Sequence, residues 1–259
     1  MKKILILVTV FVVSTLSINA QFEKALKKAG KSVANTAGNM AADMAADAAG
    51  NAAANNIVVY MDKSNNVYAD NSAYTKRLVS LVEKGFVDVD GLSLDYKVYE
   101  NSEANILACA NGSIRVYSGM MDLLTDDELL AVIANQIGHI ANKDCRDALM
   151  EVASEGNAAN ATSAQLDKLL SFSGDKLGTI INELIQIPYS EKQNDEADKY
   201  AVALLQKNGK NASALVSALE KFATMEAAMN DDEAESSPAY KYIKVNSNNA
   251  RRASLVASR

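Results

Sequence analysis

The sequence predicts an α+β fold that is mostly helical and carries a small antiparallel sheet beside one central helix. Only 2 of the 259 residues are proline and none is tryptophan, and long stretches carry apolar residues at helical intervals. The dipeptide Asn111-Gly112 stands between two short apolar runs, Ile106–Ala110 and Ser113–Tyr117. Asn-Gly in this setting is the strongest short-range signal for a β-hairpin, so strands are expected in the middle of a helical chain.

Residues 1–20 are expected to be an export signal rather than part of the fold. Lys2 and Lys3 precede an uncharged run from Ile4 to Val13, and Ile18–Ala20 is similar to a signal-peptidase site. The run is short for a bilayer span, so cleavage before Gln21 is preferred over an uncleaved anchor. The expected location is therefore outside the cytoplasm, either periplasmic or secreted.

Net charge and cysteine content restrict the function further. The net charge of −6 argues against a general nucleic-acid binder, because such proteins need a basic patch. The two cysteines, Cys109 and Cys145, would both lie in the exported domain. That compartment permits a disulfide, and two separate thiols are an equally good interpretation. A cysteine nucleophile is not expected, since His139 is the only histidine that could activate one.

Three segments are expected along the chain: a signal peptide over 1–20, an alanine-rich helical arm over 21–56, and one domain over 57–259. Alanine favours helix, but the arm has a thin apolar stripe around Met40 and Met44. We interpret the arm as solvated or docking, not as a membrane helix. In the domain, Tyr74 opens an amphipathic helix that Gly85 ends.

The strands follow that helix. Leu92, Leu94, Tyr96 and Val98 alternate with polar residues, which is typical of a strand. Together with the hairpin they predict a three-stranded antiparallel sheet.

The sheet leads into the central helix, which lies within Thr125–Cys145. Thr125 and Glu128 have the spacing of a capping box, which marks a helix start. Apolar residues then recur at helical spacing. Asn135 and His139 are four residues apart and share one face, and Gln136 lies beside them.

A second helix is expected from Ser190 to about Asn208. Glu191, Asn194 and Asp198 fall at i, i+3 and i+7 in it and so share one face. Another helix begins near Asn211, and the tail contains a basic helical turn around Arg251 and Arg252.

Two motifs resemble peptidase family M48, the HtpX- and BepA-type zinc metallopeptidases. Asn105–Asp144 resembles the family's hairpin, acidic cap and H-E-I-G-H helix, and Ser190–Asp198 resembles its S-R-x-x-E-x-E-A-D segment. The resemblance covers roughly residues 70–256 and implies a mostly helical zincin-like fold. It also implies roles for single positions: the two zinc histidines fall on Asn135 and His139, the catalytic glutamate on Gln136, the third ligand on Asn194, and a supporting aspartate on Asp198. A further histidine near the active site falls around Lys244–Asn246, where this chain has none.

These positions lack the chemistry of a zinc hydrolase. Zinc needs imidazoles and a carboxylate, and the attacking water needs a base. An amide is a poor zinc ligand, and glutamine cannot take a proton near neutral pH. We therefore expect no intact catalytic residue, no bound metal and no other cofactor.

Three functions follow as hypotheses. The first is an exported pseudopeptidase that binds or regulates envelope polypeptides, with an extended or unfolded polypeptide or another envelope protein as its partner. In active relatives the substrate adds as a strand to the sheet edge beside the zinc helix, and such pairing needs no catalysis. The corresponding edge is Ile106, Leu107, Ala108, Cys109 and Ala110. The second is an active zinc endopeptidase rebuilt around His139, Asp198 and Glu191. The third is a structural protein that assembles through the alanine-rich arm.

Overall fold

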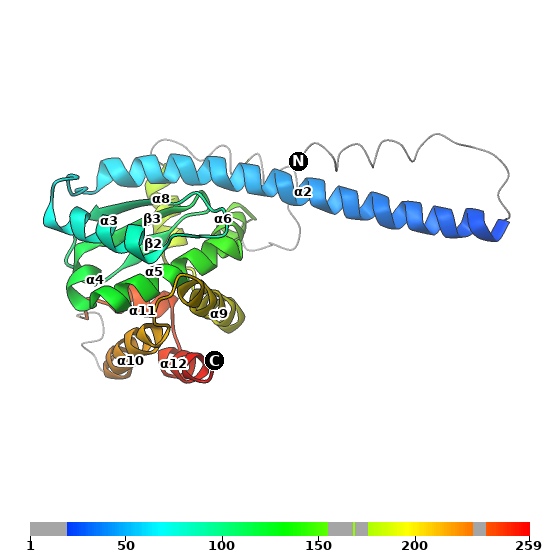
Figure 1. Cartoon of the computed structure of the whole chain (residues 1–259). Helices are drawn as coiled ribbons and strands as arrows, with labels where there is room; N and C mark the ends of the chain where they lie inside the picture. Colours follow the sequence, from blue (N-terminus) through cyan, green and yellow to red (C-terminus); the bar gives the residue numbers. More distant parts are fainter. Residues whose placement is uncertain (1–19, 155–167, 169–175, 230–236) are drawn as a thin grey trace. The chain divides into compact units, whose positions relative to one another are not determined.

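The computed structural model describes residues 20–154, 168, 176–229 and 237–259, with the side chains of residues 20–39, 154 and 176 left out (Figure 1). Residues 1–19 of the expected signal peptide lie outside the described part. The chain divides into two units, Met1–Met44 and Ala45–Arg259. In the described residues no helix is both long and apolar enough to cross a membrane.

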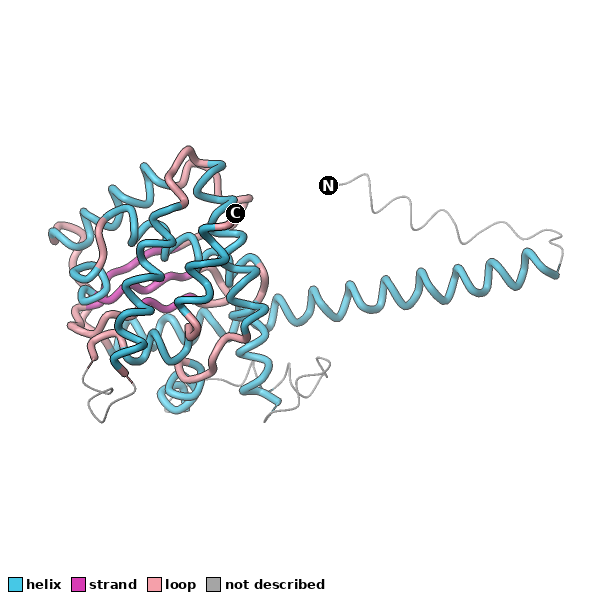
Figure 2. The backbone as a smooth tube through the Cα atoms, turned by 90° about the horizontal axis from the view of Figure 1, so that it is seen from below, coloured by secondary structure: helices cyan, strands magenta, loops and turns pink. Residues whose placement is uncertain are grey.

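The described elements confirm a mostly helical fold with a small sheet (Figure 2). In chain order they are α2 (Ala20–Ser64), α3 (Ala73–Gly85), β1 (Asp95–Tyr99), β2 (Ile106–Ala108), β3 (Ser113–Tyr117), α4 (Ser118–Leu123), α5 (Asp126–Ala141), α6 (Asp144–Ser154), α8 (Lys176–Leu184), α9 (Glu191–Lys207), α10 (Ser213–Ala228), α11 (Tyr240–Val245) and α12 (Asn249–Ala257).

Helix α2 continues through the boundary at residue 56 that the sequence suggested for the arm. Its part from Ala45 onward belongs to the second unit, where Ala53, Ile57 and Met61 are buried in the core. Alanine supplies this contact because its small side chain allows a helix to approach its neighbours closely. The low apolar content of this segment therefore reflects close packing as well as exposure.

The sheet is mixed, so the expectation of a wholly antiparallel sheet was wrong. β2 and β3 form the antiparallel hairpin that Asn111-Gly112 predicted, with Gly112 at φ +86° in its turn. β1 pairs with β3 in parallel, which gives the order β1-β3-β2. After β1 the chain first forms β2 at the opposite edge of the sheet. It then returns as β3, which lies between β1 and β2. Alternation along a strand predicts its faces but not this order.

Helices cover both faces of the sheet (Figure 1). Val98, Ile114 and Val116 point into a core formed with α3, α4 and α5. Their neighbours Tyr99 and Tyr117 point to the other face, where the C-terminal part of α2 packs with α6 and α8. Successive residues of each strand therefore point to opposite faces of the sheet, and both faces are buried. On the α2 side a buried Arg115 donates to Asp62, with Nε–Oδ1 at 2.8 Å.

The outer edge of β1 is not free. Val67, just after α2, forms a bridge to Tyr99, and the Tyr68 amide donates to the carbonyl oxygen of Val98. β2 at the other end of the sheet pairs only with β3 among the described strands. Within the described part of the chain, the open edge of the sheet therefore belongs to β2.

Candidate functional site

Helices α5 and α9 hold the residues that the sequence singled out, and they pack directly on each other. The predicted capping box starts α5: the Thr125 amide donates to Glu128 at 2.9 Å. Gly138 allows the close approach, because a Cβ there would lie 2.7 Å from the carbonyl oxygen of Ala197. A larger residue at this position would push α9 away.

The five predicted site residues on these helices are buried together. Their exposed fractions are 2 % or less: Asn135, Gln136, His139, Asn194 and Asp198. Sequence spacing predicted that each helix would present its set on one face, and the packing of α5 on α9 brings the two faces into contact. Glu191, in contrast, is exposed on α9 and contacts Asn248 and Arg251.

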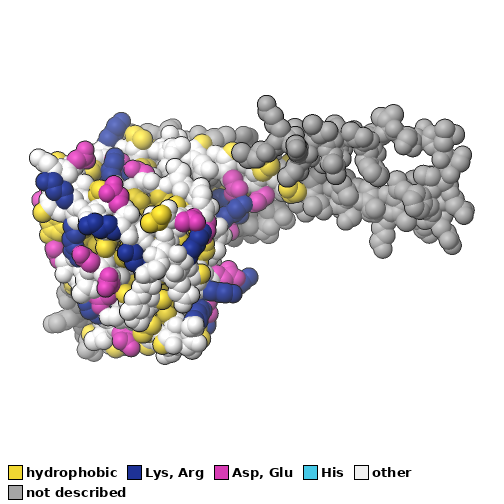
Figure 3. Space-filling model, viewed as in Figure 1, with side chains coloured by type: hydrophobic (Ala, Val, Ile, Leu, Met, Phe, Trp, Pro, Cys, Tyr) yellow, Lys and Arg dark blue, Asp and Glu magenta, His cyan; other side chains and the backbone are white. Residues whose placement is uncertain are grey.

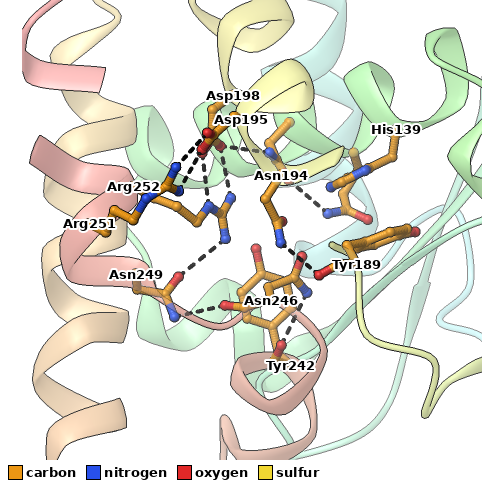
Figure 4. A network of polar contacts seen from close by, with 12 residues as sticks. His139, Tyr189, Asn194, Asp195, Asp198, Tyr242, Asn246, Asn249, Arg251 and Arg252 are labelled. Carbon is orange, nitrogen blue, oxygen red and sulfur yellow. Dashed lines mark hydrogen bonds and ion pairs between the residues drawn. The ribbon is translucent and has the colours of Figure 1, made fainter. Parts of the chain in front are cut away.

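Asp198 is bound on both carboxylate oxygens (Figure 4). Arg252 of α12 donates to it from Nε and Nη2, each at 2.8 Å, and Asn135 donates from Nδ2 at 2.8 Å. Arg252 also donates to the Asn249 side chain at 3.3 Å. Arg252 and Asp198 are both 1 % exposed. Such a paired carboxylate orients α12 against α9 and is not free to hold an ion.

The amides on α5 are engaged with each other. Gln136 Nε2 donates to Asn135 Oδ1 at 3.1 Å, while Asn135 Nδ2 faces Asp198. Both functional atoms of Asn135 therefore have partners inside the protein. These hydrogen bonds occupy buried polar groups that would otherwise be available to a metal ion.

His139 is held in one tautomer and covered on one face. Its Nδ1 lies 2.8 Å from the carboxylate of Asp144, so Nδ1 carries the proton and Nε2 is bare. Burial lowers the pKa of His139, and the Asp144 carboxylate opposes this only in part, so the ring is neutral. Tyr189 stacks on it with ring centroids 3.8 Å apart and planes 10° apart (Figure 4).

Two buried acceptors near this stack have no hydrogen-bond partner among the described residues: His139 Nε2 and Asn194 Oδ1. Asn194 Nδ2 donates to the Tyr189 carbonyl at 3.3 Å, which fixes the orientation of its amide. One imidazole and one amide oxygen do not make a zinc site, which needs about four ligands. The described residues contain no group of three His, Cys, Asp or Glu side chains that could hold a metal.

An apolar cleft lies beside this cluster. The space of about 830 Å³ that it outlines includes open solvent at its mouth. The uncharged polar residues in its lining are Asn105, Gln136, Tyr189, Tyr242 and Asn246. Apolar side chains of α2, α6, α8 and the segment after α8 supply most of the rest: Ala54, Ile57, Met61, Ala148, Leu149, Ile181, Leu184, Ile185 and Ile187. The charged residue in the lining, Lys241, pairs with Glu103 at 2.7 Å.

The open edge of β2 forms one wall of the cleft. The Tyr117 amide donates to the Asn105 carbonyl, and the Cys109 amide donates to the Ser113 carbonyl. Bonding alternates along an antiparallel pair, so the backbone of Ile106 and Ala108 points away from β3. The Ile106 amide is already bound by the Asn105 side chain at 2.9 Å. Among the residues that the structure describes, the groups left for a partner are the Ile106 carbonyl and both backbone groups of Ala108.

The expected strand Ile106–Ala110 is shorter than predicted. β2 ends at Ala108, while Cys109 and Ala110 belong to the turn, although both still line the cleft. The turn begins early because the Gly112 amide donates to the Cys109 carbonyl. Cys109 and Cys145 are both free thiols in the structure.

The surface in Figure 3 mixes charges of both signs on the face that is drawn. Lysine and arginine side chains do not gather there into one basic area. This distribution gives no support to a nucleic-acid site on that face.

Comparison with known proteins decides the ancestry of this site. The model of peptidase family M48 matches residues 80–241. Metalloprotease LoiP of Escherichia coli (strain K12) is 34% identical over 189 residues, which cover 71% of this chain and 75% of LoiP. The chain belongs to peptidase family M48. Metalloprotease YcaL of the same organism is also similar to it, at 33% identity over 181 residues, 69% of this chain and 70% of YcaL.

Four residues of this M48 site were not assigned a role from sequence: Asp144, Tyr189, Asn249 and Arg252. Arg252 appeared only as part of a basic turn, and no local pattern linked it to Asp198, 54 positions away. Asn246 lies within the range where the family histidine was expected, and the structure places it in the cleft lining with its Oδ1 buried and unpaired among the described residues.

Proposed function

We propose that this M48 protein is catalytically inactive and serves as a binding or regulatory module for extended polypeptides. The observation that carries the proposal is the closed amide chain Gln136–Asn135–Asp198, which takes up the family's base and first-ligand positions. Losing a general base alone costs about 10²–10⁴ in rate, and without a metal the attacking water is not activated.

The rebuilt zinc site is the weaker candidate. It needs His139, Asp198 and Glu191 as ligands, but both oxygens of Asp198 face Arg252 and the side chain of Glu191 is 61% exposed. Freeing Asp198 would leave a buried arginine without its partner, which is strongly unfavourable. The geometry therefore favours the inactive alternative.

The proposed ligand is an unfolded or extended polypeptide in an exported compartment. The open edge of β2 lets such a segment pair as an added strand. The apolar wall from α2, α6 and α8 suits the side chains of an unfolded chain. Export is supported by the basic start and apolar run of residues 1–20.

Replacing Ala108 by proline tests the edge directly. Ala108→Pro removes an amide that points into the cleft and leaves the β3 ladder intact, since proline is tolerated on outward edge positions. Binding of fluorescent, reduced and carboxymethylated casein should weaken about tenfold, the value of one net hydrogen bond of about 1.4 kcal/mol.

Ala108→Ser is the matched control, because it changes the side chain and keeps the amide. Both variants are compared with the parent by urea unfolding, so that a loss of fold is recognised. Equal casein affinity for Ala108→Pro and Ala108→Ser would remove β2 as the binding edge.

A further inference from the structure

Two thiols line the cleft where β2 ends. Cys109 directly follows the edge strand β2, and Cys145 lies in the first turn of α6; both line the cleft. The Cys145 sulfur lies 3.8 Å from the hydroxyl of Tyr189. Burial raises the pKa of Cys145, and the charge of Cys109 raises it further.

We propose that Cys109 and Cys145 form a reversible disulfide that closes this end of the cleft to polypeptide. The disulfide is a covalent modification site outside the M48 catalytic positions, and its effect on binding rests on the proposed function. It takes a disulfide-bearing oxidant, either a small molecule such as glutathione disulfide or a protein of the same chemistry.

The exposure of the two thiols sets the order of reaction. Cys109 is partly exposed and Cys145 is buried, so Cys109 reacts first. Its thiolate attacks one sulfur of glutathione disulfide and releases one glutathione. The Cys145 thiolate then attacks the Cys109 sulfur and releases the second glutathione. Two protons leave the protein thiols, and two electrons reduce the oxidant to two glutathione molecules.

Burial raises the pKa of Cys109 to about 11. Because the thiolate is the attacking species, the first step is slow near neutral pH and becomes faster as the pH rises towards that value. Cys109 and Cys145 therefore remain reduced unless they are exposed to an oxidant for a long time.

Geometry explains why the bridge would close the cleft. A disulfide holds its two Cβ atoms about 3.5–4.5 Å apart. A strand added to β2 needs about 4.8 Å between backbones, and its side chains need more space before the wall of α6. With the end of β2 tied to α6, the added strand cannot continue past Ala108.

The first measurement is chemical. The full-length protein is incubated with glutathione disulfide, unfolded, treated with a thiol alkylating reagent and weighed by mass spectrometry. We expect loss of two hydrogen atoms, no alkylation and reversal by dithiothreitol. In Cys145→Ser the same treatment should stop at a glutathione adduct on Cys109. A stable glutathione adduct on wild-type Cys109, or two alkylated thiols, would overturn the inference.

The second measurement is casein binding in both redox states. Oxidation should weaken binding at least about tenfold, equivalent to 1.4 kcal/mol, and the double variant Cys109→Ser, Cys145→Ser should bind equally with and without oxidant. A bridge that leaves affinity unchanged contradicts the closure of the cleft. Absence of binding in either state, with the bridge formed, counts against the proposed function instead, so the two failures are distinguishable.

Discussion

Asp198 is the residue on which the buried polar contacts of the site converge. Its partners come from α5 and α12, so one carboxylate connects three helices. Neither it nor Arg252 is exposed by more than 1 %. A buried pair with both hydrogen bonds of the guanidinium satisfied is costly to break from one side only.

Asp198→Asn should therefore destabilise the protein by about 3–5 kcal/mol, because it leaves the buried arginine unpaired. The measurement is the free energy of unfolding in urea. Asp195→Asn is the matched control: Asp195 lies on the same helix and binds Arg251 in the same two-bonded way, but near the surface. The control should cost about 1 kcal/mol or less. Similar losses in both variants would show that Asp198 has no special structural role.

Single residues also show how far sequence reasoning reached at the site. Helical spacing placed Asn135, His139 and Asn194 on the correct faces, because i, i+4 neighbours on a helix are fixed by its geometry. The stack of Tyr189 on His139 was not predictable. It depends on the loop before α9, where the Tyr189 amide donates to the Val245 carbonyl, 56 positions later in the chain.

At the level of elements, the start of α5 combines a local cap with a long-range ion pair. Glu128 receives the Thr125 amide, and Lys221 and Ser217 of α10 also donate to its carboxylate, at 2.6 and 2.5 Å. Burial alone would raise the pKa of Glu128, but these donors together lower it to about 2. The sequence predicted the cap and not the contacts from α10.

The lowered pKa of Glu128 predicts acid sensitivity. The folded value of about 2 lies below the ordinary value of 4.5, so the stabilisation is present above pH 4.5 and is lost as the pH falls towards 2. At pH 7, Glu128→Gln should cost about 3 kcal/mol, because each tenfold change in proton affinity corresponds to about 1.4 kcal/mol. The difference from wild type should shrink as the pH approaches 2. The exposed Asp127→Asn, one residue earlier, serves as control; a Glu128→Gln loss independent of pH would contradict this assignment.

Sheet order illustrates what an element alone cannot specify. The hairpin was predictable because Asn-Gly favours a tight turn. The parallel pairing of β1 with β3 was not, since residues 100–105 carry no signal for the side on which the chain returns. The order matters for function, because it leaves β2 rather than β1 beside the cleft.

For the whole molecule, the boundary at Ala45 can be tested by truncation. A chain that begins at Ala45 keeps Ala53, Ile57 and Met61 in the core, so its free energy of unfolding should match that of the full chain within about 0.5 kcal/mol. A chain that begins at residue 65 loses these contacts and the Asp62 partner of Arg115, and it should not fold. Solution mass of the first truncation also tests assembly: an unchanged oligomeric state would leave the arm without a role in it.

Asn135, Gln136 and Asn194 are amides at the positions that would bind zinc or act as the base in an active member of the family. Zinc analysis of the purified protein, alongside the variant Asn135→His, Gln136→Glu, Asn194→Glu, is the decisive measurement. We predict no stoichiometric zinc and no casein cleavage in the wild type, with zinc uptake in the variant. One zinc per wild-type chain that is lost in His139→Ala, together with chelator-sensitive cleavage of casein, would show that the protein is an active zinc peptidase.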